Sequence, residues 1–145
     1  MEVYKLTFNQ ENLDAFYREY FKTYPLRSKQ YIETPIVPSL NRWLSLSPKA
    51  RSPIKNAWRD YVAYVVKEAG LTGLNLTSCR LNIHYIFPDR RLSDLDNRTP
   101  KLIQDSLTKA GVWTDDNYTV VKELRLTGSY SKNNPAMVLT IEEVA

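Results

Sequence analysis

The chain has 145 residues, 43% of them hydrophobic, and a formal charge of +4 from 20 lysines and arginines against 16 acidic residues. This length and composition predict one ordinary globular domain. With one cysteine and one histidine, the chain excludes an intrachain disulfide and a thiolate metal site, and a Ser-His-Asp hydrolase would depend on His84 alone. No apolar run has the length of a membrane span and no cleavable signal is present, so we expect a cytoplasmic protein with no membrane partner.

The N-terminal part of the chain predicts a strand followed by a helix. Residues Val3–Phe8 alternate in the manner of a strand, and Asn9 is a suitable N-cap for a helix from about Glu11 to Tyr24. The aromatic stripe of this helix favours a core-facing surface over a base-stacking one, because an amphipathic helix must bury one face. Residues Tyr31–Val37 fit an edge strand, since Pro35 interrupts the run.

Residues 38–53 predict an extended loop, because prolines 38, 48 and 53 argue against a continuous helix. The cations between residues 27 and 59 are accompanied by only one acidic residue, Glu33. This charge distribution favours a polyanionic partner such as DNA, although a plain solvated connection fits the segment equally well. The candidate phosphate-contacting residues here are Asn41, Arg42, Lys49 and Arg51.

The second half of the chain predicts one long helix and further strands. Ser52 and Pro53 suit the start of a helix that ends at Gly70. Strands are expected from about Ser78 to Phe87, over Tyr118–Thr127 and over Met137–Glu142, with a long hairpin loop between the last two. We interpret His84 as a structural or surface residue of the first of these strands. The order of elements predicts a single α+β domain, a mixed β-sheet flanked by helices.

Acidic residues are grouped between Pro88 and Asp116. In an extended stretch Asp94 and Asp96 would point the same way, and Asp115 and Asp116 follow a short helix that begins at Thr99. If that helix reverses the chain, the two acidic pairs converge. Oxygen ligands of this kind suit Mg²⁺, and metal-assisted phosphodiester hydrolysis is the chemistry that fits best.

Several basic residues accompany these carboxylates. Lys101 is predicted to point away from the core face of the short helix, with Arg90, Arg91 or Arg98 nearby to hold a phosphate or stabilise charge developing on it. Gly111 is expected to end the helix.

The same residues also have simpler interpretations. The run Asp115–Asn117 suits a polar turn, and Lys101 with Asp105 suits a surface pair one helical turn apart. An EF-hand is excluded, because Arg98 and Thr99 stand where a ligand and the turn glycine are needed.

The order and spacing of these motifs resemble the RusA family of Holliday-junction resolvases, which are small bacterial and phage-associated endodeoxyribonucleases. The resemblance covers roughly Val37 to Glu142. It is carried by an Asp-x-Asp-Asn motif with a following lysine, a helix that ends in a Gly-hydrophobic pair, and an Asp-Asp pair, with further matches near Pro38 and Pro88. The matching residues are Asp94, Asp96, Asn97, Lys101, Gly111, Val112, Asp115 and Asp116.

This resemblance implies a RusA-like fold, Mg²⁺ as the cofactor (with Mn²⁺ as a substitute), four-way junction DNA as the partner, and a homodimer encoded by a bacterium or phage. It implies that Asp94, Asp96 and Asp116 are metal-binding catalytic aspartates, Asp115 a further ligand and Lys101 the catalytic lysine. The residues expected to bind DNA are Asn41, Arg42, Lys49, Arg51, Arg90, Arg91 and Arg98.

The chain departs from the family pattern in two places. Three residues separate Asn97 from Lys101, one more than the family spacing. Residues 1–30 are predicted to be an N-terminal extension or an insertion, so that the first strand of the family corresponds either to Val3–Phe8 or to Tyr31–Val37.

The predicted function is therefore a Mg²⁺-dependent, structure-selective endodeoxyribonuclease that resolves Holliday junctions by paired symmetric nicks in DNA recombination and repair. The alternatives are a nuclease for other branched DNA, such as flaps or forks, and a catalytically silent module that binds branched DNA.

Overall fold

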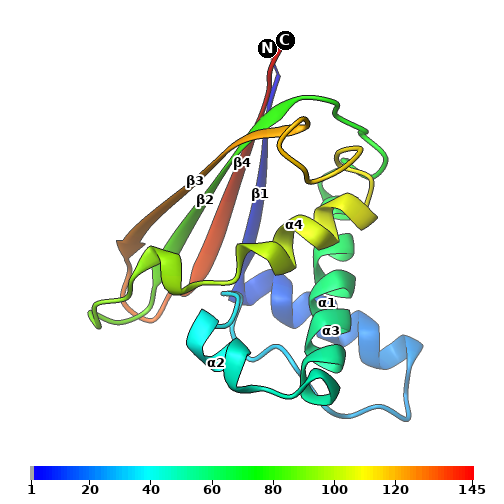
Figure 1. Ribbon diagram of the computed structural model, residues 1–145. Coiled ribbons are helices and arrows are strands. Elements are labelled where there is room, and N and C mark those ends of the chain that lie inside the picture. The colour runs from blue at the N-terminus through cyan, green and yellow to red at the C-terminus, as the bar shows by residue number, and fades with distance from the viewer. Residues whose placement is uncertain (1) are drawn as a thin grey trace.

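A four-stranded mixed sheet forms one layer of the molecule and helices form the other (Figure 1). The computed structural model describes residues 2–145. The strands lie in the order β1-β4-β2-β3; β4 pairs antiparallel with both β1 and β2, and β2 pairs parallel with β3. The predicted α+β fold with a mixed sheet is confirmed. The elements are β1 (Val3–Asn9), α1 (Gln10–Thr23), α2 (Leu40–Ser45), α3 (Pro48–Glu68), β2 (Cys79–Phe87), the 3₁₀ turn η1 (Leu95–Asn97), α4 (Pro100–Lys109), β3 (Val121–Tyr130) and β4 (Ala136–Glu143).

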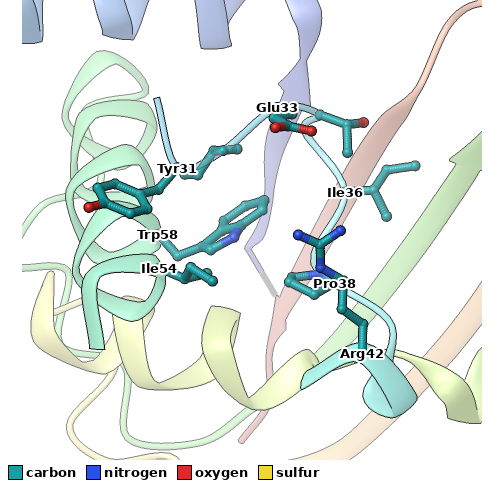
Figure 2. Close-up of a pocket in the computed structure, with 9 residues that line it drawn as sticks. Tyr31, Glu33, Ile36, Pro38, Arg42, Ile54 and Trp58 are labelled. Carbon is teal, nitrogen blue, oxygen red and sulfur yellow. The ribbon is translucent and has the colours of Figure 1, made fainter. Parts of the chain in front are cut away.

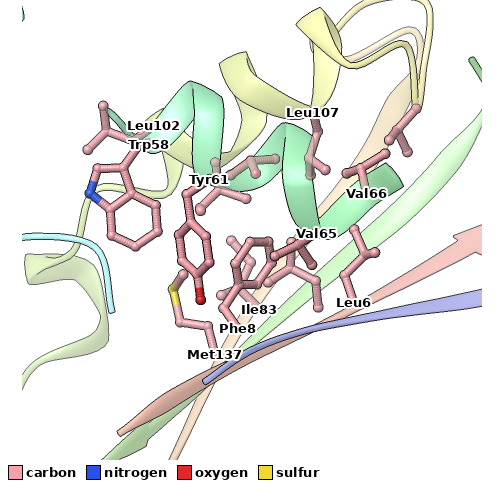
Figure 3. Close-up of a cluster of buried hydrophobic side chains, with 14 of the residues drawn as sticks. Leu6, Phe8, Trp58, Tyr61, Val65, Val66, Ile83, Leu102, Leu107 and Met137 are labelled. Carbon is pink, nitrogen blue, oxygen red and sulfur yellow. The ribbon is translucent and has the colours of Figure 1, made fainter. Parts of the chain in front are cut away.

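The core lies between one face of this sheet and the helices. Alternate strand residues such as Phe8, Ile83 and Met137 are fully buried and face Trp58 and Tyr61 of α3 (Figure 3). The intervening strand residues point to the opposite face, which is polar. His84 lies on that face with its ring nitrogens 2.7 and 2.8 Å from the hydroxyls of Thr127 and Ser129, in agreement with a structural role.

Helix α1 begins where the sequence predicts. Asn9 is its N-cap, and its side chain and that of Asn12 complete a reciprocal capping box. The aromatic stripe packs inward, with Phe16 and Tyr17 buried and Phe16 5.5 Å from the ring centroid of Tyr61. The core-facing interpretation of this helix is therefore confirmed. No helix among residues 2–145 is long and apolar enough to cross a membrane.

Three predictions about local structure are wrong. Residues 31–37 are not a strand but an irregular segment, which is held by the burial of Ile32, Ile36 and Val37. Residues 38–53 contain α2 and the start of α3 instead of an extended loop. Pro48 stands at the first position of α3, after the N-cap Ser47, where a missing N–H costs nothing. The third wrong prediction is the start of the long helix at Ser52 and Pro53, because α3 begins at Pro48 and Pro53 lies inside it.

The predicted hairpin between the last two strands is also wrong, because β2 lies between β3 and β4. The strand predicted over Tyr118–Thr127 begins three residues later, at Val121, since Asn117–Val120 form a turn closed by the hydrogen bond from Val121 N to Asn117 O at 2.9 Å. Of the two candidates for the first strand, only Val3–Asn9 is a strand.

We predict that Phe8→Ala destabilises the protein by about 3–5 kcal/mol, because the side chain is fully buried and packs edge-on against Tyr61 at 5.3 Å. The control is Thr7→Ala on the exposed face of the same strand, with an expected change within about 0.5 kcal/mol. Denaturant unfolding measures both. Similar losses in the two variants would contradict the packing of β1 against the core.

Candidate functional site

The centre of the site is a group of charged side chains on α4 and the turn that follows it. Lys101 Nζ lies 3.1 Å from Asp105 Oδ1 and 3.9 Å from Asp116 Oδ2. Lys101 and Asp105 are four residues apart on α4, so they face the same side of the helix. Asp116 approaches both residues from the turn that follows α4. The turn after α4 therefore places Asp116 beside Lys101.

The return of the chain depends on Gly111. Its φ is +74°, which disfavours any residue with a Cβ, and such an atom would lie 3.2 Å from the Cα of Gly73. Backbone hydrogen bonds from Asn75 N to Gly111 O (2.7 Å) and from Leu76 N to Val112 O (2.9 Å) then fix the segment. Trp113 is buried and donates from its ring nitrogen to Thr108 Oγ1 at 2.7 Å. These contacts hold the segment that brings Asp116 beside α4.

The charges in this group influence one another. The pKa of the Asp116 carboxyl is raised by partial burial and by its hydrogen bond with Asp105. The pKa of Lys101 is raised by its hydrogen bond to Asp105, which keeps the ammonium group protonated. Lys101 therefore acts as a cation that can contact a phosphate oxygen, and it is unsuited to the role of a general base.

A pocket of about 530 Å³ opens beside this group, between α2, α3 and α4. Its walls combine the apolar side chains Leu40 and Trp43 of α2 with Lys55 of α3 and the charged group on α4. Three contacts hold α2 and its approach at the pocket: Asn41 N donates to Asn97 Oδ1 at 3.2 Å, Thr99 Oγ1 donates to Pro38 O at 2.9 Å, and Ser39 forms an isolated β-bridge with Arg98.

Asp94 and Asp96 are arranged differently from the prediction. Asp94 has an extended backbone, but Asp96 lies within η1, so the two residues do not share one extended stretch. Asp94 is the N-cap of η1, but its side chain makes no capping hydrogen bond. It lines a second pocket of about 490 Å³ together with Asn97 and Arg98. Asp96 is exposed.

Arg98 connects the two pockets, because it lines both. Its Nη2 donates to Ser93 Oγ at 2.6 Å, and its guanidinium carbon lies 5.2 Å from the ring centroid of Phe87. Burial lowers the pKa of Arg98, and its Nε is buried with no hydrogen-bond partner among residues 2–145. The partly buried cation Arg98 thus lies between the pocket of Asp94 and the pocket of Asp116.

Within residues 2–145, no three histidine, cysteine or acidic side chains are close enough to hold a metal ion between them. The donors themselves suit Mg²⁺, which prefers carboxylate oxygens. The carboxylate of Asp94 is not used in capping, and that of Asp116 lies beside a second acidic side chain. A divalent cation would relieve the repulsion between such carboxylates.

Asp115 has a structural contribution. One carboxylate oxygen accepts from Asp116 N at 2.7 Å and the other from Asn117 Nδ2 at 2.9 Å. Its side chain therefore shapes the turn that presents Asp116, as the polar-turn interpretation predicts.

The predicted DNA-binding residues form two surfaces. Asn41, Arg42 and Lys49 are exposed on α2 and at the start of α3, whereas Arg51 donates to the carbonyls of Trp43 (3.0 Å) and Leu44 (3.3 Å) at the end of α2. Arg90 and Arg91 are exposed in the loop before η1, where the guanidinium carbon of Arg90 lies 5.1 Å from the ring centroid of Tyr130.

Sequence reasoning missed three residues of the site. Asp105 is predicted only as a surface partner of Lys101, and its position beside Asp116 depends on the chain reversal. Trp43 and Lys55 carry no motif, and they join the site because α2 and α3 pack beside α4.

We predict that Asp105→Asn lowers the pKa of Asp116 toward that of an ordinary carboxyl, because the change removes a neighbouring carboxyl group. NMR titration of the side-chain carboxyl carbons, without divalent cations, measures this value. Asp14→Asn on α1 is the control and leaves the value unchanged. An Asp116 pKa that is identical in wild type and Asp105→Asn would show that the two carboxyl groups are not coupled.

No family model matches the sequence, but a search of known proteins finds several relatives. The chain is 39% identical over 98 residues to crossover junction endodeoxyribonuclease RusA of Escherichia coli K12, which covers 63% of this chain and 80% of that protein. It is 38% identical over 99 residues to the crossover junction endodeoxyribonuclease of Enterobacteria phage 82, covering 63% and 81% of the two chains. The Shigella sonnei protein of the same name is 39% identical over 98 residues. The chain therefore belongs to the RusA family of crossover junction endodeoxyribonucleases.

Proposed function

We propose that this chain is a Mg²⁺-dependent endodeoxyribonuclease that resolves four-way DNA junctions by paired symmetric nicks, in recombination and repair, inside a bacterial cell. The observation that carries the proposal is the approach of Asp116 to Lys101, at 3.9 Å, beside a pocket lined by basic and aromatic residues. The names of the relatives support the same activity and substrate.

The roles of the residues follow from their positions. Asp94, Asp96 and Asp116 are the proposed ligands of Mg²⁺, with Mn²⁺ as a substitute, and Asp115 positions Asp116 through the turn. When bound, the metal ion would polarise the scissile phosphate and lower the pKa of a water molecule. Lys101 contacts a phosphate oxygen and stabilises the negative charge that develops on it. Arg98 neutralises the region between the acidic residues of η1 and Asp116, where a phosphate would otherwise be repelled.

The DNA is proposed to contact the two basic surfaces on either side of these carboxylates. One is formed by Asn41, Arg42 and Lys49, and the other by Arg90 and Arg91. Phosphate contacts of this kind position a duplex without reading its sequence, which suits an enzyme that recognises the shape of a junction. Flaps and forks present related shapes, and they are the comparison substrates for the experiment below.

We predict that Asp94→Asn and Asp116→Asn each reduce junction cleavage by at least about 10²-fold while junction binding is retained, because each change removes a ligand charge but leaves the basic surfaces intact. Cleavage in Mg²⁺ and binding in EDTA are measured on the same labelled junction, with flap and fork substrates beside it. The control, Asp14→Asn, retains wild-type cleavage. Wild-type rates in either site variant would remove that residue from the proposed metal site.

A homodimer is part of the proposal, because resolution requires two nicks at symmetry-related strands and each chain carries one candidate site. A twofold assembly provides the second site with the symmetry of the junction itself.

We predict that mixed dimers of wild type and Asp96→Asn nick one strand of a junction and rarely complete resolution. Sedimentation gives the mass of the assembly, and cleavage of a junction held in supercoiled plasmid separates single nicks from paired ones. Complete resolution by a chain that sediments as a monomer would exclude the dimer.

A further inference from the structure

The segment Lys22–Tyr31, which we call the basic loop, has no part in the site described above. It joins the last turn of α1 to the buried Ile32 and runs past the N-terminal end of α3 (Figure 1). All ten of its residues are exposed. It contains Lys22, Arg27 and Lys29 and no acidic residue.

The basic loop is held against α1 by specific contacts. Arg27, in the middle of the loop, contacts the end of α1: its Nη1 donates to the hydroxyl of Tyr20 at 2.6 Å, and its guanidinium carbon lies 4.5 Å from the ring centroid of Tyr24. At its end, Ile32 N donates to the hydroxyl of Tyr17 at 3.1 Å. Lys29 Nζ lies 4.8 Å from the ring centroid of Tyr31. These contacts position the loop against α1, and its three cations are exposed.

The basic loop is also continuous with the surface of α2 and α3. Tyr31 and Arg42 line the same small pocket of about 110 Å³, together with Ile54 and Trp58 of α3 (Figure 2). Between residues 20 and 59 the chain carries eight lysines and arginines, and Glu33 is the only acidic residue. The nearby Asp60 lies 3.4 Å from Arg59 and is thus paired within α3.

The chemistry of this surface fits a phosphate backbone better than a protein or a small molecule. It has cations at intervals along an exposed loop, no concave apolar site of its own, and direct continuity with the residues proposed to contact DNA.

We propose that the basic loop is a further DNA-contacting element, which binds the phosphates of a duplex arm of the junction and extends the basic surface of α2 and α3. This inference rests on the proposed function for the identity of the DNA. The strand β1 is needed to complete the sheet, but α1 and the basic loop lie outside the sheet and add surface beside α3. Such contacts would add affinity for a junction arm without changing the chemistry at the carboxylates.

The test is the salt dependence of junction binding, measured in EDTA, for wild type and the double variant Lys22→Ala/Lys29→Ala. Arg27 is left intact because it braces α1. Each lost phosphate contact should lower the slope of log affinity against log salt concentration by about 0.9, so we expect a reduction of about 1.8. Shortening the junction arms should reduce the affinity of wild type more than that of the variant.

The matched control is Lys5→Ala/Lys122→Ala, two exposed lysines on the strands β1 and β3 that leave the slope unchanged. Thermal unfolding confirms that both double variants are folded. A wild-type slope in Lys22→Ala/Lys29→Ala would overturn the inference. A different result would separate the two proposals: wild type binds a junction no better than a linear duplex, but the salt dependence of DNA binding is still weaker in the variant. The proposed function would then fail, and the DNA contact of the basic loop would stand.

Discussion

The turn between α4 and β3 is the constraint on which the candidate site depends. Gly111 takes a positive φ where the chain passes within contact distance of Gly73, and the burial of Val112 and Trp113 fixes the segment that follows. This packing brings Asp116 back beside α4 and sets its distance from Lys101. The free energy for holding these charged residues together thus comes from apolar burial and backbone hydrogen bonding, and not from the charges themselves.

The electrostatics of the site follow from that placement. Partial burial and the neighbouring Asp105 raise the pKa of Asp116, although Lys101 opposes this shift, and the hydrogen bond to Asp105 raises the pKa of Lys101, so the lysine stays charged. On the other side, the half-buried Arg98 separates this group from Asp94. The site thus contains both negative and positive side chains, and a site that binds a divalent cation and a phosphate together requires both. Membership of the RusA family gives the arrangement its interpretation as a nuclease site.

Much of this could be predicted from the sequence, for identifiable reasons. The cap at Asn9, the apolar period of α1 and α3 and the alternation in β2 are local signals, and they gave the elements and the class of fold. The pairing of strands was not predictable in this way. The segment between β3 and β4 contains good turn residues, yet β2 lies between the two strands, because pairing is decided by the whole sheet. The spacing of Asp94 and Asp96 fits an extended stretch, but the chain enters a 3₁₀ turn directly after Asp94. The helix α2 was missed because prolines on both sides suggested a loop, whereas Pro48 in fact begins the next helix.

The measurement that tests the central claim most directly is the incubation of the wild-type chain with a labelled synthetic four-way junction and a matched linear duplex, in Mg²⁺ and in EDTA. The account predicts paired nicks at symmetry-related positions of the junction in Mg²⁺, products that a DNA ligase can seal, little cleavage of the duplex, and none in EDTA. Equal cleavage of junction and duplex, or cleavage that persists in EDTA, would contradict it.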